Sequence, residues 1–268
     1  MNKAAIIGLV AMVVGGASAT LGYFAGKSPA VVISADANLA SPAPDASDAK
    51  IEAVVRNYLL KNPEIMIEVQ TALETKRDEQ SRVARTDFIS KSGDDLFKDP
   101  EDAVLGNPDG NVTVVEFFDY NCGYCRRAVG DMQALLKTDT NVRFVLKELP
   151  ILGPDSVKAH IVAHAFKKLV PEKYGDFHVA LMEAGQATEE SALALAVSMG
   201  AEENALRTGM GDPAIAASFE RNNNLAEGLN ITGTPSYVIQ DEVIPGALGL
   251  EVLAQKVANV RQCQKATC

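Results

Sequence analysis

Aromatic and basic side chains are scarce in this sequence. It has no tryptophan, only 6% of its 268 residues are aromatic, and 25 Lys and Arg against 35 Asp and Glu give a net charge of −10. A nucleic-acid partner is therefore not expected, because binding to phosphates needs a basic surface. The hydrophobic content of 47% and the charged content of 22% are those of a globular protein of one or two domains that can bury a core.

Cysteine is scarce as well, with four residues in the whole chain. Four cysteines are too few to hold a chain of this length together by disulfides. They lie in two close pairs, Cys122 with Cys125 and Cys263 with Cys268. This spacing favours redox chemistry or metal binding over a disulfide scaffold.

Residues 1–25 have the pattern of an export signal. Lys3 precedes an uncharged, largely apolar stretch, and Ala17-Ser18-Ala19 offers a cleavage site of small residues. The alternative is an uncleaved membrane anchor, because the apolar character continues to Ala25 and reaches the roughly 20 residues that span a bilayer. In both alternatives the rest of the chain lies outside the cytoplasm, where disulfides persist.

The segments that follow are predicted to be a flexible linker, residues 26–49, and a helical arm, residues 50–92. Residues 28–49 contain seven Ala, four Ser, three Pro and three Asp, which bury too little apolar area to order the chain. In the arm, apolar residues recur at spacings of three and four, and Asn62-Pro63 divides it into two helices. The apolar side of the arm leaves two interpretations open, which are docking on its own domain and self-association.

Residues 93–268 are predicted to form an α/β domain. Residues 112–118 and 142–148 are rich in β-branched and aromatic residues, and the segment between them has helical periodicity over 125–136. This β-α-β order predicts two parallel strands joined by a right-handed crossover. A helical insertion is predicted over about 154–228. A hairpin and a closing helix are then predicted at 236–240, 243–244 and 250–262.

The candidate catalytic motif is Cys122-Gly123-Tyr124-Cys125, which lies between the first predicted strand and the start of the helix. A helix N-terminus presents unpaired backbone N–H groups and the positive end of the helix dipole, which favour a thiolate at the first cysteine. Cys122 is therefore predicted to be the nucleophile. Cys125 lies one turn further along and is predicted to be the more buried, resolving thiol.

A zinc site is the structural alternative for this motif. It would need two further ligands, and the remaining cysteines, Cys263 and Cys268, lie at the extreme C-terminus with a spacing that suits a zinc ribbon poorly. His160 and His164 are four residues apart on a predicted helix, but nothing else nearby completes a site, so we interpret them as partly buried structural histidines. Neither a metal nor a cofactor is expected.

Two segments far apart in the sequence resemble one family. The run Glu116-Phe117-Phe118-Asp119-Tyr120-Asn121 before the cysteine motif, together with Gly233-Thr234-Pro235, resembles the DsbA-like thiol-disulfide oxidoreductases of the bacterial periplasm. The resemblance covers about residues 95–262 and implies a thioredoxin fold with an inserted helical domain. The arm, with Tyr58-Leu59-Leu60-Lys61-Asn62-Pro63-Glu64, is similar to that of the suppressor of copper sensitivity protein C and Com1-like proteins.

The resemblance also implies roles for single residues. Pro235 matches the cis-proline beside the active site, and Thr234 before it would offer backbone groups to an extended substrate. Glu116 matches the buried acid beneath the cysteine pair, and Lys147 is predicted to be its counter-ion. The alternative is that both charges lie on the surface at strand edges.

The residues between the cysteines bear on the direction of the reaction. Gly123-Tyr124 and Thr234 differ from the Pro-His and Val of the strongly oxidising DsbA and resemble the periplasmic disulfide isomerases. The first hypothesis is therefore a periplasmic isomerase or reductase of unfolded or misbridged exported proteins, trimeric through its arm and recycled by a membrane redox partner. The alternatives are a monomeric dithiol oxidase and a copper(I)-binding protein of copper tolerance. Cys263 and Cys268 form a local disulfide or are incidental.

Overall fold

The structure is a computed structural model that describes residues 46–268, so the predicted signal or anchor lies outside the described residues. Helix α1 (Ala46–Lys61) forms part of a unit of its own, apart from residues 63–268. It begins at Ala46, within the predicted linker. Alanine favours helix, and Asp48 lies in the first turn, where a negative charge is stabilising, so the predicted linker ended too late. Among the described helices, none is long and apolar enough to cross a membrane.

Helix α2 (Glu64–Lys91) begins after Asn62-Pro63, as predicted, because proline has no backbone N–H to continue the preceding helix. Its last turns belong to the same compact unit as the α/β domain, whereas the sequence placed the boundary after residue 92. The reason is apolar packing, since Ile89 is buried in a core cluster and Phe88 packs against it. The short helix α3 (Gly93–Phe97) follows and buries Leu96.

A sheet of five strands forms the centre of this unit, in the order β1-β3-β2-β4-β5. Its strands are β1 (Ala103–Gly106), β2 (Val112–Phe118), β3 (Val142–Glu148), β4 (Ser236–Ile239) and β5 (Glu242–Pro245). Strands β2 and β3 are parallel, as the β-α-β pattern predicts, and the other neighbouring pairs are antiparallel. Strand β1 was not predicted, because its four residues carry too short a pattern to recognise.

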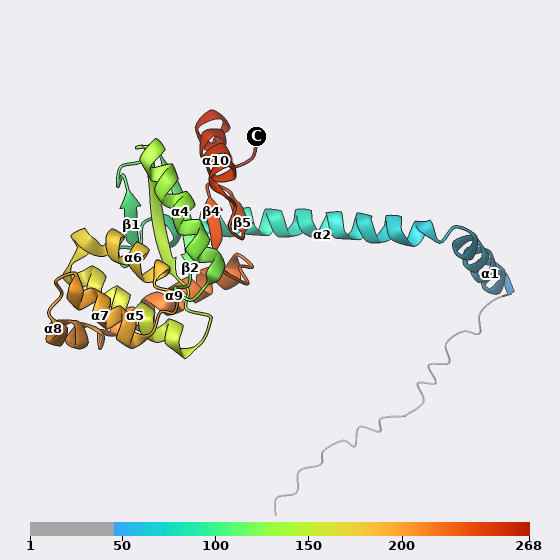
Figure 1. Ribbon diagram of the computed structural model, residues 1–268. Coiled ribbons are helices and arrows are strands. Elements are labelled where there is room, and N and C mark those ends of the chain that lie inside the picture. The colour runs from blue at the N-terminus through green and yellow to red at the C-terminus, as the bar shows by residue number, and fades with distance from the viewer. Residues whose placement is uncertain (1–45) are drawn as a thin grey trace, which may run out of the picture. The chain divides into compact units, whose positions relative to one another are not determined.

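Helix α4 (Gly123–Thr138) connects β2 to β3, and five helices lie between β3 and β4. These are α5 (Pro154–Leu169), α6 (Tyr174–Glu183), α7 (Glu189–Ser198), α8 (Glu203–Gly209) and α9 (Pro213–Gly228), with a 3-10 turn at Pro171–Lys173. Figure 1 shows α5, α7 and α8 gathered beyond one end of the sheet. Helix α10 (Leu250–Cys263) ends the fold. This is the predicted thioredoxin fold with a helical insertion.

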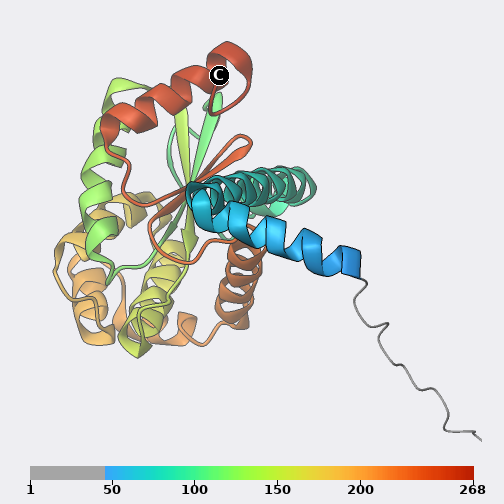
Figure 2. The ribbon, with the colours of Figure 1, turned by 90° about the vertical axis from the view of Figure 1, so that its right-hand side faces the viewer.

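The two faces of the sheet are covered by different helices, and residues of β2 alternate between them. Val114 and Phe118 belong to the cluster that includes residues of α4 and α10. Val115 and Phe117 belong to the cluster that includes the end of α2 and α9. Figure 2 shows α4 and α9 on opposite sides of the strands. Glu116 therefore lies on the α4 face.

Candidate active site

Cys122 is the N-cap residue of α4, and its side chain accepts a hydrogen bond from the backbone N–H of Cys125 at 3.4 Å. The placement follows from the local sequence, because β2 ends at Phe118 and a short polar loop carries the chain into the helix. Both cysteines are free thiols. Cys122 is 6% exposed and Cys125 is fully buried, which confirms the predicted order of burial.

The two thiols of this pair differ strongly in acidity. The pKa of Cys122 is lowered to about 5, first by its side-chain hydrogen bond with Cys125 and further by backbone hydrogen bonds from Cys125 and Tyr124, despite its burial. The pKa of Cys125 is raised far above the usual thiol range by its interaction with Cys122 and by burial. At neutral pH this arrangement gives a thiolate at Cys122 and a thiol at Cys125, which are the states of an attacking and a resolving cysteine.

The loop before β4 lies against the nucleophile. The Thr234–Pro235 peptide bond is cis, as the resemblance implies. The Sγ of Cys122 lies 3.0 Å from the Thr234 carbonyl oxygen, although the two residues are 112 positions apart. Because β4 begins at Ser236, Thr234 and Pro235 precede the strand ladder.

Glu116 lies on the α4 face of β2 and is buried, so the surface alternative is wrong for this residue. Burial and, to a smaller extent, the charge of Cys122 together raise its pKa to about 8, and the interaction with the Tyr237 side chain offsets only part of this rise. Tyr237 is the register partner of Glu116 on β4. The sequence did not single out Tyr237, since its pairing with Glu116 depends on the sheet order. Glu116 is thus a buried acid near the cysteine pair that carries a proton at neutral pH.

Lys147 does not pair with Glu116, so the predicted counter-ion is wrong. In the parallel register Glu116 faces Leu146, whereas Lys147 faces Phe117 and so lies on the opposite side of the sheet. Lys147 is fully buried there, forms an ion pair with Asp102 at 2.5 Å, and donates a hydrogen bond to the Asp95 carbonyl oxygen. It is therefore neither a strand-edge surface charge nor part of the cysteine site.

The loop between β2 and Cys122 is held by polar contacts that the sequence did not reveal. Asp119 is fully buried, and its carboxylate accepts hydrogen bonds from the Asn121 backbone N–H at 2.8 Å and the Ser156 hydroxyl at 2.8 Å. The Asn121 side chain donates to the Ala187 carbonyl oxygen at 2.9 Å and accepts from the Ala187 N–H at 2.8 Å. The signal in the sequence is a pair of polar residues between an apolar strand and the cysteine motif.

The two residues inside the motif face outward. A side chain at Gly123 would meet no atom within 4 Å, so this position is free to vary. Tyr124 is 60% exposed, and the guanidinium of Arg127 lies 4.2 Å from the centre of its ring.

A second buried cluster lies at the end of β3, where the sequence predicted ordinary histidines. His160 and His164 are fully buried rather than partly buried, and their Nδ1 atoms lie 3.3 and 2.6 Å from the Glu148 carboxylate. The Nε2 atom of His160 accepts a hydrogen bond from the Tyr120 backbone N–H at 3.3 Å. The cluster therefore also contacts the chain two residues before Cys122.

The C-terminal cysteines form the local disulfide that was one of the two predicted alternatives. Cys263 is bonded to Cys268, so neither thiol can supply the ligands that a zinc site at Cys122 and Cys125 would need. Among residues 46–268, no group of three or more His, Cys, Asp or Glu side chains is placed to hold a metal ion.

Comparison with known proteins agrees with this geometry. Residues 113–258, more than half of the chain, match the family described as DSBA-like thioredoxin domain. Residues 49–80 match the family described as copper resistance protein ScsC N-terminal domain.

Solved structures and a curated relative are similar as well. A thioredoxin-like oxidoreductase from Silicibacter pomeroyi DSS-3 is 43% identical, with a TM-score of 0.61, over 63% of this chain and 98% of its own. A linker-deletion mutant of Proteus mirabilis ScsC is 27% identical, with a TM-score of 0.60, over 80% of this chain and 95% of its own. Disulfide bond formation protein D of Bacillus subtilis is 29% identical over 53% of this chain and 68% of its own length. The chain belongs to the DsbA-like thioredoxin-domain family and is a thiol-disulfide oxidoreductase with ScsC-like relatives.

Proposed function

We propose that this protein is a disulfide isomerase or reductase of exported proteins, in which Cys122 attacks the substrate. The observation that carries the proposal is the lowered pKa of Cys122 beside the buried thiol of Cys125. A nucleophile that is ionised at neutral pH is what disulfide attack needs, whether in isomerisation, in reduction or, from the oxidised pair, in oxidation, so this pKa supports the thiol chemistry and not its direction. Gly123-Tyr124 and Thr234 support the proposed direction by their resemblance to the isomerases.

In the first step the Cys122 thiolate attacks one sulfur of a substrate disulfide. A mixed disulfide forms between Cys122 and that sulfur, and the other substrate cysteine leaves as a thiolate. In isomerisation, another substrate thiolate then attacks the mixed disulfide, so the substrate gains a new disulfide and Cys122 is released as a thiolate. The net reaction exchanges one substrate disulfide for another and consumes no oxidant.

In reduction, Cys125 attacks Cys122 in the mixed disulfide, and the second substrate cysteine leaves. Cys125 must first lose its proton, and Glu116 is the proposed acceptor. The charge of the Cys122 thiolate raises the pKa of Glu116, so forming the mixed disulfide removes that charge and favours release of the Glu116 proton to water. The carboxylate formed in this way then accepts the Cys125 proton. The product is a Cys122–Cys125 disulfide, which a membrane redox partner would have to reduce.

Thr234 and Pro235 are the proposed substrate-binding residues. They lie beside Cys122 and before the first residue of the β4 ladder. The Pro235 carbonyl oxygen accepts a hydrogen bond from the Gly246 N–H at 2.8 Å, so the backbone groups of Thr234 are the ones proposed to pair with an extended substrate segment. We also propose export to the periplasm, because residues 1–25 have the pattern of an export signal, and the proposed substrates are therefore other exported proteins.

Self-association through the arm is part of the proposal. Helix α1 carries a row of exposed apolar side chains at helical spacing, namely Ile51, Val54, Val55 and Tyr58. Exposed apolar rows of this kind mark interaction sites, and a second and third copy of the chain are the proposed partners. Light scattering of the mature protein should give the mass of a trimer. Removal of residues 50–62 should give a monomer, and an unchanged mass would contradict the assignment.

Cysteine variants test the reaction itself. Cys122→Ala should abolish insulin reduction and the reactivation of scrambled ribonuclease. Cys125→Ala should stop insulin reduction and accumulate covalent adducts with substrate on non-reducing gels. Wild-type protein that oxidises reduced ribonuclease but does not reactivate the scrambled form would support the oxidase alternative instead.

A further inference from the structure

A groove of about 430 Å³ opens beside the cysteine site, and one residue of α2 helps to form it. Its walls include Tyr124 from the first turn of α4, Thr234 and Pro235 from the loop before β4, and Arg85 from α2. Thr234 links the groove to the reaction, because its carbonyl oxygen lies 3.0 Å from Cys122 Sγ. The size of the groove suits a few residues of an extended polypeptide rather than a whole folded surface.

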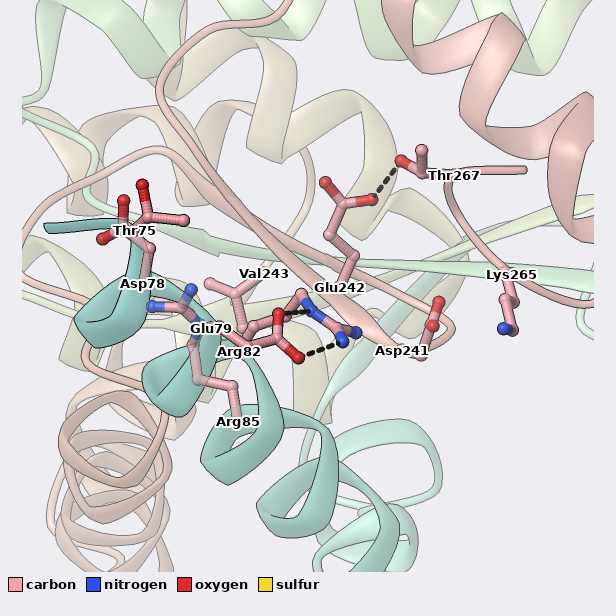
Figure 3. A pocket seen from close by; sticks show the side chains of 10 residues that line it. All are labelled: Thr75, Asp78, Glu79, Arg82, Arg85, Asp241, Glu242, Val243, Lys265 and Thr267. Atoms are coloured by element: carbon pink, nitrogen blue, oxygen red, sulfur yellow. Dashed lines mark hydrogen bonds and ion pairs between the residues drawn. The ribbon is translucent and has the colours of Figure 1, made fainter. Parts of the chain in front are cut away.

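Among the described residues that line this groove, Arg85 alone carries a formal charge, and it is half-buried. It forms no ion pair with any other residue in the range 46–268. Arg82, one turn earlier on the same helix, contrasts with it, because it donates two hydrogen bonds to Glu79, at 2.9 and 2.8 Å. Figure 3 shows the Arg82–Glu79 contacts as dashed lines, whereas none reaches Arg85.

The end of α2 is held beside the groove by contacts on both sides of Arg85. The Thr86 hydroxyl donates a hydrogen bond to the Asp241 carbonyl oxygen at 3.3 Å. Phe88 packs against the core, with its ring so close to Gly228 that no Cβ would fit there. Arg85 and Val243 also line a second cavity, of about 640 Å³, so the two hollows meet along β5, which is one of the two edge strands of this sheet.

We propose that Arg85 is a specificity-determining residue that binds a carboxylate of the substrate polypeptide close to its reactive disulfide. The inference rests on the proposed function, in that a polypeptide disulfide has to enter this groove. A half-buried guanidinium without a partner gains a charge-assisted, two-pronged contact when an Asp or Glu side chain arrives. Tyr124 and Pro235 line the same groove, so a carboxylate bound there would be partly shielded from water, which strengthens that contact.

The preference for an acidic substrate would oppose the charge of the protein as a whole. With a net charge of −10, long-range electrostatics favour basic over acidic peptides. A preference for an acidic residue would therefore report a local contact. A hydrogen bond to a charged group is worth enough to change the specificity by about tenfold.

The test uses peptides that share one disulfide and differ only in a residue two positions from the reactive cysteine, which is Glu, Gln or Lys. Wild-type protein should reduce the Glu peptide with a kcat/KM about tenfold above that for the Lys peptide. Arg85→Glu should reverse the preference. Arg77→Gln, a loss of one arginine from an exposed position of the same helix outside the groove, should retain it. The same charge preference in wild type and Arg85→Glu would overturn the inference.

Binding measurements test the role of Arg85 independently of the proposed function. Peptides with serine in place of the reactive cysteine cannot be reduced, so fluorescence anisotropy reports the groove alone. If wild-type protein reduces no peptide but binds the Glu form better than the Lys form, and Arg85→Glu reverses this, the proposed function fails and the groove inference holds. If binding shows no dependence on Arg85, the inference fails whatever the activity.

Discussion

The pKa values of two buried glutamates on neighbouring parallel strands are shifted in opposite directions. Burial and, to a smaller extent, the Cys122 charge together raise the pKa of Glu116 on β2 to about 8. Burial also acts to raise the pKa of Glu148 on β3, but hydrogen bonds from His160 and His164 outweigh it and hold that pKa far below the usual range. Both side chains have lost nearly all contact with solvent. Burial alone therefore does not decide the charge of an acid in this fold.

The difference lies in the partners that the sheet face offers. Within residues 46–268 Glu116 forms no ion pair, and Lys147 lies on the other side of the sheet. Glu148 lies against two histidines of α5, His160 and His164. In His164, Nδ1 lies 2.6 Å from a carboxylate oxygen of Glu148 and Nε2 lies 3.0 Å from one of Glu101. We infer that Glu148 is a permanent charge that joins the inserted helices to the sheet. Glu116 is an acid that can change its protonation near neutral pH.

Removing the Glu148 carboxylate should have the largest effect. Glu148→Ala removes the charged acceptor beside the Nδ1 atoms of two fully buried histidines, and losing two buried hydrogen bonds to a charged group costs about 3–5 kcal/mol. Urea unfolding at pH 7, followed by circular dichroism, measures the loss.

Lys98→Gln is a suitable control, since it breaks an exposed ion pair with Asp94 and should cost less than about 1 kcal/mol. A loss for Glu148→Ala as small as that of the control would show that the histidine cluster contributes little to the fold.

The sequence predicted the parts of the site that depend on local pattern. Strands β2 and β3 begin and end where their β-branched runs begin and end, and this places Cys122 at the start of α4. The cis-proline followed from the resemblance. Each of these features can be recognised from a short stretch of neighbouring residues.

What the sequence did not predict depends on how distant elements meet. The β2–β3 register places Lys147 on the side of the sheet away from Glu116. Its partners there are Asp95 of α3 and Asp102, which comes just before β1, a strand too short to recognise in the sequence. The histidines of Glu148 come from an inserted helix, and Arg85 reaches the groove only because α2 continues along β5. No local periodicity encodes such contacts, so only the folded arrangement reveals them.

A smaller effect should come from Glu116 and have the opposite dependence on pH. The pKa of Glu116 is about 8 in the folded protein against 4.5 in the reference state, so its contribution to stability is present below about pH 4.5 and is lost as the pH rises through 8. For Glu148 the pKa is lowered on folding, so its contribution is present above pH 4.5 and is lost as the pH falls below it.

Glu116→Gln removes the penalty of ionising a buried acid. Between pH 5 and pH 8 the reduced variant should therefore gain about 3–4 kcal/mol of stability relative to the reduced wild type. Urea unfolding across this range, in the presence of a reductant, gives the two curves. Parallel curves would show that Glu116 keeps an ordinary pKa, and the proton transfer proposed for Cys125 would then need another acceptor.

Glu116→Gln should also slow the attack of Cys125 on the mixed disulfide about tenfold or more, because that step would have lost its base.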